Sequence, residues 1–84
     1  MKPGDKLLKE INKKYTPSTT IPLKFGRYDM VVKTNDEGYA ILLFIGKANE
    51  DGIIKGNRFT RVLIKDSNGN TIKDHWDHKG KATS

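Results

Sequence analysis

The longest uninterrupted apolar run in the chain is Tyr39–Ile45, which is bounded at both ends by charged or turn-forming residues. The run is too short to cross a membrane, and its length is typical of a buried strand. As a strand it would place alternate residues on opposite faces: Tyr39, Ile41, Leu43 and Ile45 on one, and Ala40, Leu42 and Phe44 on the other. Because both faces would be apolar, the pattern predicts a central strand that is covered on both sides.

Two further segments alternate between apolar and polar residues. Tyr28–Thr34 does so regularly and Asn57–Lys65 less regularly, and this period of two predicts half-buried strands. The polar segment Asn35–Gly38 joins the first of them to the apolar run and predicts an antiparallel hairpin. A second hairpin is predicted at Asp66–Asn70, where Asn-Gly tolerates positive φ, with Thr71–Trp76 returning as the next strand.

The segment before these strands has helical spacing. Residues 5–15 are predicted to form a helix that starts at the favourable N-cap Asp5 and ends before Pro17. Its apolar stripe would cover one face of the apolar run and consists of Leu7, Leu8, Ile11 and Tyr15. The following segment, Ile21–Phe25, contains Pro22, which confines it to an edge strand or an extended arm.

Together these elements predict an α+β domain that is mostly β, with a short N-terminal helix followed by a twisted antiparallel meander of four to five strands. We expect such a sheet to curl towards a small barrel of the SH3-like or OB-like kind. The second face of the apolar run would then be covered by a second copy or by the curving sheet, through Ile21, Leu23, Phe25, Ile53 and Ile54. Residues 46–56 fit either an irregular loop or a short extra strand. The domain is predicted to span residues 1–78, with residues 79–84 as a disordered tail.

Composition and charge narrow the classes of function. The chain has 84 residues, no cysteine and a net charge of +6, with the positive charge concentrated towards its two ends. The absence of cysteine excludes disulfides and thiolate metal sites. The sequence shows no targeting segment and predicts a cytoplasmic protein that does not bind membranes. A basic surface of this size serves solubility or attracts a polyanion, and the charge alone does not decide between them.

Candidate chemistry is sparse. No nucleophile elbow, phosphate-binding loop or dinucleotide fingerprint is present, so we expect no enzyme activity and no cofactor. Two histidines, His75 and His78, would reach one metal ion in a helix or turn, but would point to opposite faces in a strand. Basic residues beside aromatic rings suggest a surface for single-stranded nucleic acid, comprising Arg27, Tyr28, Arg58, Arg61, Lys65, Lys73 and Trp76.

The sequence therefore predicts a small non-enzymatic binding or accessory domain whose partner is a protein or another copy of the chain. The alternative is a small β-barrel that binds nucleic acid through its basic and aromatic residues. A third and more remote reading is a small basic metal-binding or ribonuclease-like protein that uses His75 and His78.

Overall fold

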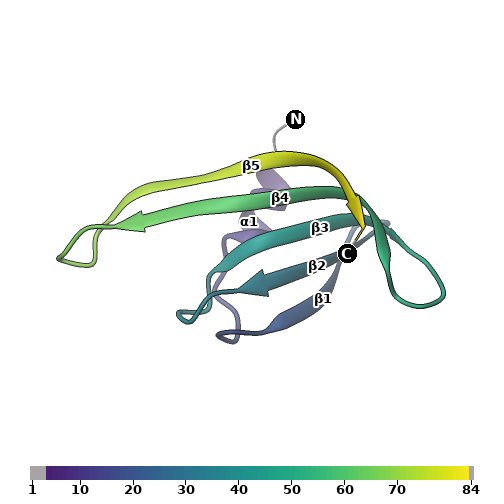
Figure 1. The fold of residues 1–84 in the computed structure, drawn as a ribbon, viewed down its shortest axis with the longest axis horizontal. Helices are drawn as coiled ribbons and strands as arrows, with labels where there is room; N and C mark the ends of the chain where they lie inside the picture. The colour runs from purple at the N-terminus through teal and green to yellow at the C-terminus, as the bar shows by residue number, and fades with distance from the viewer. Residues whose placement is uncertain (1–3, 84) are drawn as a thin grey trace.

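The apolar run forms most of β3 (Ala40–Ala48), the middle strand of a five-stranded antiparallel sheet. The computed structural model describes residues 4–83, and in it the strands follow one another in chain order (Figure 1). The remaining elements are α1 (Asp5–Ile11), β1 (Thr20–Phe25), β2 (Tyr28–Thr34), β4 (Ile54–Lys65) and β5 (Thr71–Thr83). The predicted α+β meander is confirmed. The sheet is not closed, since β1 and β5 lie at its two edges, and the predicted SH3-like or OB-like barrel is not confirmed.

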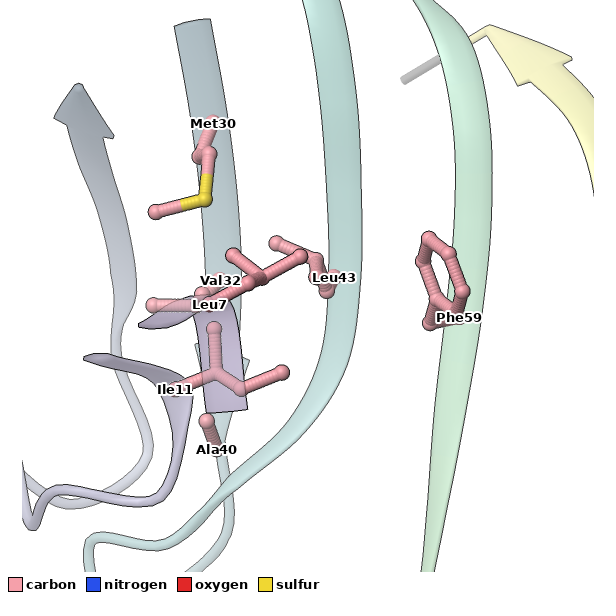
Figure 2. Packing of buried hydrophobic residues seen from close by; sticks show 7 residues of the cluster. All are labelled: Leu7, Ile11, Met30, Val32, Ala40, Leu43 and Phe59. Carbon is pink, nitrogen blue, oxygen red and sulfur yellow. The ribbon is translucent and has the colours of Figure 1, made fainter. Parts of the chain in front are cut away.

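One face of the sheet packs against α1, and we call it the helix side. Its buried cluster joins the helix to the three inner strands and contains Leu7, Ile11, Met30, Val32, Ala40, Leu43 and Phe59 (Figure 2). Phe59 is fully buried and stands directly across from Leu43 in the β3–β4 ladder. Leu8 and Tyr15 pack against this cluster as partly buried residues, so the predicted helical stripe does cover one face of β3.

A β-bulge changes the faces that were predicted for the apolar run. Lys33 pairs with Leu42 and Thr34 pairs with Ala40, which leaves Ile41 as an extra residue in β3. Because an extra residue reverses the alternation beyond it, Ala40 joins Leu43 on the helix side. Ile41 is instead among the exposed apolar residues. Strict alternation through the run was therefore wrong at its first two strand residues.

The opposite face of the sheet has its own, smaller buried region. Phe44 and Ile54 are buried there, outside the helix-side cluster. Of the residues predicted to cover this face, Ile54 alone is buried there, whereas Ile53 is exposed. The three predicted from β1 were wrong, since they pack against the helix-side cluster instead: Ile21, Leu23 and Phe25.

The two glycines at the β3–β4 crossing allow the strands to approach closely. Gly46 and Gly56 are paired, and a Cβ added to Gly46 would lie 2.2 Å from the carbonyl oxygen of Lys55. A Cβ on Gly56 would lie 2.0 Å from the carbonyl oxygen of Ile45. Any larger residue would force the two backbones apart at this point, so both positions require glycine.

Several predicted boundaries differ from the structure. The helix ends at Ile11, before the predicted residue 15, and its N-cap is Gly4, with Asp5 already in the first turn. Residues 46–56 form neither of the two predicted arrangements, because β3 and β4 extend into them and leave a short turn between Ala48 and Ile54. The predicted disordered tail is also wrong for residues 79–83, which continue β5 and pair with β4. Ser84 lies outside the described residues.

Candidate functional site

The most distinctive surface element is the far half of the β4–β5 hairpin. The β3–β4 ladder ends at Thr60, whereas β4 and β5 remain paired out to Lys65 and Thr71. Residues 61–76, which we call the arm, therefore form a two-stranded ribbon that projects beyond the other strands (Figure 1). The arm ends in a turn in which Asp66 accepts bonds from the backbone N–H groups of Asn68 and Asn70, both at 2.9 Å. A two-stranded ribbon has little stability of its own, so the arm needs contacts with the body or with a partner.

Apolar side chains on the arm remain in contact with solvent. Ile64 is 44% exposed and Ile72 is 66% exposed, the largest value among the exposed large apolar residues. Ile72 is the extra residue of a β-bulge, since Ile64 pairs with Lys73 while Lys65 pairs with Thr71. Val62 and Leu63 are only partly buried. Clustered exposed apolar residues of this kind are typical of interaction surfaces.

The base of the arm is fastened to the body by Arg61. Its guanidinium bonds both carboxylate oxygens of Asp74 at 2.7 Å and the carbonyl oxygen of Ala40 at 3.3 Å. The Arg61 side chain is only 4% exposed. This hydrogen-bonded ion pair holds the pKa of Asp74 below its ordinary value. Arg61 is thus a structural residue that links β4, β5 and the start of β3.

Aromatic rings and cations meet beside Arg61 on the helix side. The guanidinium lies 5.7 Å from the ring centres of both Tyr39 and Trp76. The ammonium groups of Lys14 and Lys65 each lie 4.9 Å from the centre of the Tyr39 ring. The indole N–H of Trp76 donates to the side-chain oxygen of Asn12 at the end of α1, at 3.1 Å. These contacts join the helix end to the arm.

An ion pair also holds Lys65 towards the body. Its ammonium group bonds a carboxylate oxygen of Glu37, in the β2–β3 turn, at 2.5 Å. This bond lowers the pKa of Glu37 and raises the pKa of Lys65. Two of the cations predicted to contact nucleic acid, Arg61 and Lys65, are therefore paired with carboxylates of the chain itself.

The residues predicted to bind nucleic acid are divided between separate surfaces. Four of them share the helix side but lie far apart along it, with Tyr28 at one end of β2 and the others towards the arm: Arg61, Lys65 and Trp76. Arg58 and Lys73 lie on the opposite side, at positions paired with Phe44 and Ile64 respectively. Arg27 lies in the β1–β2 turn, with its guanidinium 5.6 Å from the centre of the Tyr28 ring. The predicted set does not form one continuous basic face.

The two histidines of β5 point to opposite faces of the sheet. His78 stands across from Phe59 on the helix side, with the ring centres 5.1 Å apart, and its Nε2 is 2.9 Å from the side-chain oxygen of Asn57. His75 stands across from Val62 on the other side, with Nε2 3.2 Å from Asp77. The pair cannot hold one ion together. Within residues 4–83, no group of three or more metal-ligating side chains is found.

The two edges of the sheet differ in their capacity to accept another strand. Thr34 donates its backbone N–H to the Thr19 carbonyl, which makes these two residues a hydrogen-bonded pair. Every second pair from there along β1 and β2 is hydrogen-bonded as well, and the residues of these pairs are the ones on the helix side. Because hydrogen-bonded and non-bonded pairs alternate, Pro22 lies at a position that faces the outer edge of β1, where its missing N–H blocks a new strand. The alternation carries across the sheet through the paired residues Val32, Leu43, Phe59 and His78. Leu43 and Phe59 therefore bond each other, while His78 does not bond Phe59. Along β5, the backbone groups of Asp74, Trp76 and His78 therefore point away from β4.

A cavity of about 560 Å³ opens beside the start of α1. It is bordered by the helix residues Asp5 to Leu7, by Phe25 and Tyr28 at the β1–β2 turn, and by the glycine crossing of β3 and β4. Gly4 also borders the cavity, and the titratable residues among those that line it are Asp5, Lys6 and Tyr28.

Sequence reasoning identified neither the arm nor the role of Arg61. A turn was predicted at Asp66–Asn70, but the sequence did not indicate that β4 and β5 extend beyond the end of β3. The segments predicted on either side of this turn, Asn57–Lys65 and Thr71–Trp76, have nine and six residues against seven in the apolar run, so their lengths did not signal a projecting hairpin.

Comparisons with known proteins give no relative from which a function could be inferred, so the proposal below is argued from the fold and the surface alone. No family model, no curated protein and no solved structure matched the chain. In the described part of the chain, no helix has the length and apolar character needed to span a membrane.

Proposed function

We propose that the protein is a small non-enzymatic protein-binding domain and that the arm is its docking element. The observation that carries this proposal is the projection of a two-stranded ribbon with exposed isoleucines beyond the rest of the sheet. Such a ribbon presents both apolar side chains and backbone hydrogen-bonding groups, which are the two features that strand-mediated recognition uses.

The fastening of the arm supports this role. Arg61 bonds the Ala40 carbonyl and Lys65 bonds Glu37, and these two contacts hold the helix side of the arm to the body. The opposite side of the arm, with Ile64, is left turned away from the body. A docking element held in one position loses less conformational entropy on binding than a mobile one, so its affinity for a partner is higher.

The positions of the basic residues favour a protein partner over nucleic acid. Binding of single strands requires a continuous basic groove with rings on which bases stack. Here Trp76 donates to Asn12 and lies beside Arg61, and the cations of the predicted set occupy two faces and a turn. The positive net charge then acts mainly in solubility.

The test compares arm variants in quantitative affinity capture from cell extract. The full chain carries Ile64→Asp and Ile72→Asp in one variant, and Ile53→Asp in a matched control, because Ile53 is also exposed but lies outside the arm. We expect partners captured by the wild type to be lost from the arm variant and retained by the control. Equal capture by the arm variant and the wild type would contradict the proposal.

A salt titration with oligonucleotides tests the competing function. We expect the wild-type chain to bind single-stranded and duplex oligonucleotides only weakly, even at low salt. Micromolar affinity that falls steeply with added salt would contradict a purely protein-binding role, since counterion release has that signature.

A further inference from the structure

The free edge of β5 is regular between two bulges. One bulge is at Ile72, and the other lies between His78 and Lys81, where Gly80 has a φ of +87°. Between them, Lys73–His78 pairs residue by residue with β4 and has no strand on its other side. We infer that a second copy of the chain pairs with this edge, antiparallel and about a two-fold axis, to form one continuous sheet. This inference rests on the proposed function, because most of the edge belongs to the arm.

The backbone of this edge is suited to such pairing. Asp74, Trp76 and His78 direct their N–H and C=O groups outwards, whereas Lys73, His75 and Asp77 bond to β4. In a two-fold antiparallel pair, Asp74 of one copy then exchanges hydrogen bonds with Trp76 of the other. The helix sides of the two copies lie on the same face of the joined sheet, because paired residues point to the same side. The other edge, β1, does not have this capacity, since Pro22 blocks it.

Charge selects the register and identifies the partner as a second copy. With Asp74 opposite Trp76, the axis passes between the two His75 residues, and Lys73 of each copy stands opposite Asp77 of the other. Lys73 is exposed and the Asp77 side chain is 42% exposed, so both are accessible for these contacts. The symmetry forms the Lys73–Asp77 pair twice, and oppositely charged residues across strands stabilise a sheet.

Neighbouring registers bring like charges together. A shift of two residues in one direction places Asp74 opposite Asp74 of the other copy. A shift of two residues in the other direction places Lys73 opposite Lys79. Like charges directly across a ladder are destabilising, so the register that pairs Lys73 with Asp77 is favoured over both. The charges of this edge therefore match those of a second copy in one register. An unrelated acidic strand would have no reason to carry charges at this spacing.

Sedimentation velocity of the intact chain tests this inference over concentrations from about 10 µM to about 1 mM. The variants are Lys73→Asp, Asp77→Lys and the double charge swap. Lys79→Asp is the matched control. It changes the net charge by the same amount as Lys73→Asp, but residue 79 lies opposite the neutral Thr71 of the other copy in the proposed register. Circular dichroism of each variant verifies that it is folded.

We expect the wild type to dimerise with rising concentration and each single swap at 73 or 77 to raise the dimer dissociation constant at least about tenfold. The double swap should restore dimerisation, and Lys79→Asp should have little effect. Stronger association of Lys73→Asp would overturn the register, since the introduced carboxylate would then face Lys79 of the other copy. A wild type that stays monomeric throughout would overturn the self-pairing. The proposed function would still stand in that case if capture of another protein depends on the arm.

Discussion

Replacing Arg61 by alanine separates a structural role for this residue from a role in binding. The change removes two charge-assisted bonds to Asp74 and one bond to the Ala40 carbonyl, all from a side chain that is only 4% exposed. Hydrogen bonds to charged groups contribute about 1.5–3 kcal/mol each when buried. The Asp74 side chain is 36% exposed, so water replaces part of what it loses and the sum must be discounted.

We therefore expect Arg61→Ala to lower the free energy of unfolding by about 2–3 kcal/mol. A domain of this size has a total stability of about 4–13 kcal/mol, so this loss is a large share of it. With a urea m-value of about 1 kcal/mol/M, the unfolding midpoint should fall by about 2–3 M. The assay is urea unfolding followed by the fluorescence of Trp76 and, independently, by circular dichroism.

Arg58→Ala is the matched control for this measurement. Arg58 lies on the same strand, is exposed and faces the opposite side, so its removal changes the net charge equally. Its effect on the free energy of unfolding should stay within about 0.5 kcal/mol. If the two variants lower the urea midpoint by the same amount, the structural role assigned to Arg61 is wrong.

Three further variants or titrations test other parts of the structure. Gly56→Ala should lower the free energy of unfolding by about 1–3 kcal/mol because its Cβ would meet the Ile45 carbonyl. Gly4→Ala has open space around it and loses only the preference for glycine at the N-cap, so in the same urea assay it should cost less than about 1 kcal/mol. Phe59→Ala should cost about 3–5 kcal/mol in thermal unfolding, since the ring is fully buried. The pKa of Asp74, followed by carboxyl NMR, should lie below the ordinary aspartate value because Arg61 stabilises the ionised form.

The sign of the last effect follows from proton binding. The unfolded chain protonates Asp74 at a higher pH than the folded chain does. The stabilisation of the folded chain by the Arg61–Asp74 pair is therefore complete above the pKa that Asp74 has in the unfolded chain, and it is lost as the pH falls through the pKa that Asp74 has in the folded chain. An NMR midpoint at or above the ordinary value would contradict the ion pair. Equal unfolding midpoints for Gly56→Ala and Gly4→Ala would contradict the close strand crossing, and a mild effect of Phe59→Ala would place that ring outside the core.

Local pattern was sufficient to predict the central strand and its hairpins. The apolar run has no polar position to expose, and Asn35–Gly38 and Asp66–Asn70 are turn-forming segments between strands. These features depend on residues close in sequence. The end of β5 was missed for the converse reason, because residues 79–83 pair through their backbone and carry no large apolar side chain.

The register of the arm could not be read from the sequence, and the role of Arg61 depends on it. Counting outwards from the Asp66–Asn70 pair without a bulge would place Arg61 opposite His75. The extra residue Ile72 shifts the ladder by one, so that Arg61 stands opposite Trp76 and reaches Asp74. Bulges depend on how the strand packs against its neighbours, which no local pattern in this chain reveals.

Hydrogen–deuterium exchange along β5, measured at low and high protein concentration, tests the central claim most directly. At low concentration the amides of Lys73, His75 and Asp77 should be protected, and the outward-facing amides of Asp74, Trp76 and His78 should exchange quickly. At high concentration a second copy should protect the outward set as well. Outward amides that exchange equally fast at both concentrations would contradict strand pairing between copies, and the absence of alternation would contradict the register of β5 itself.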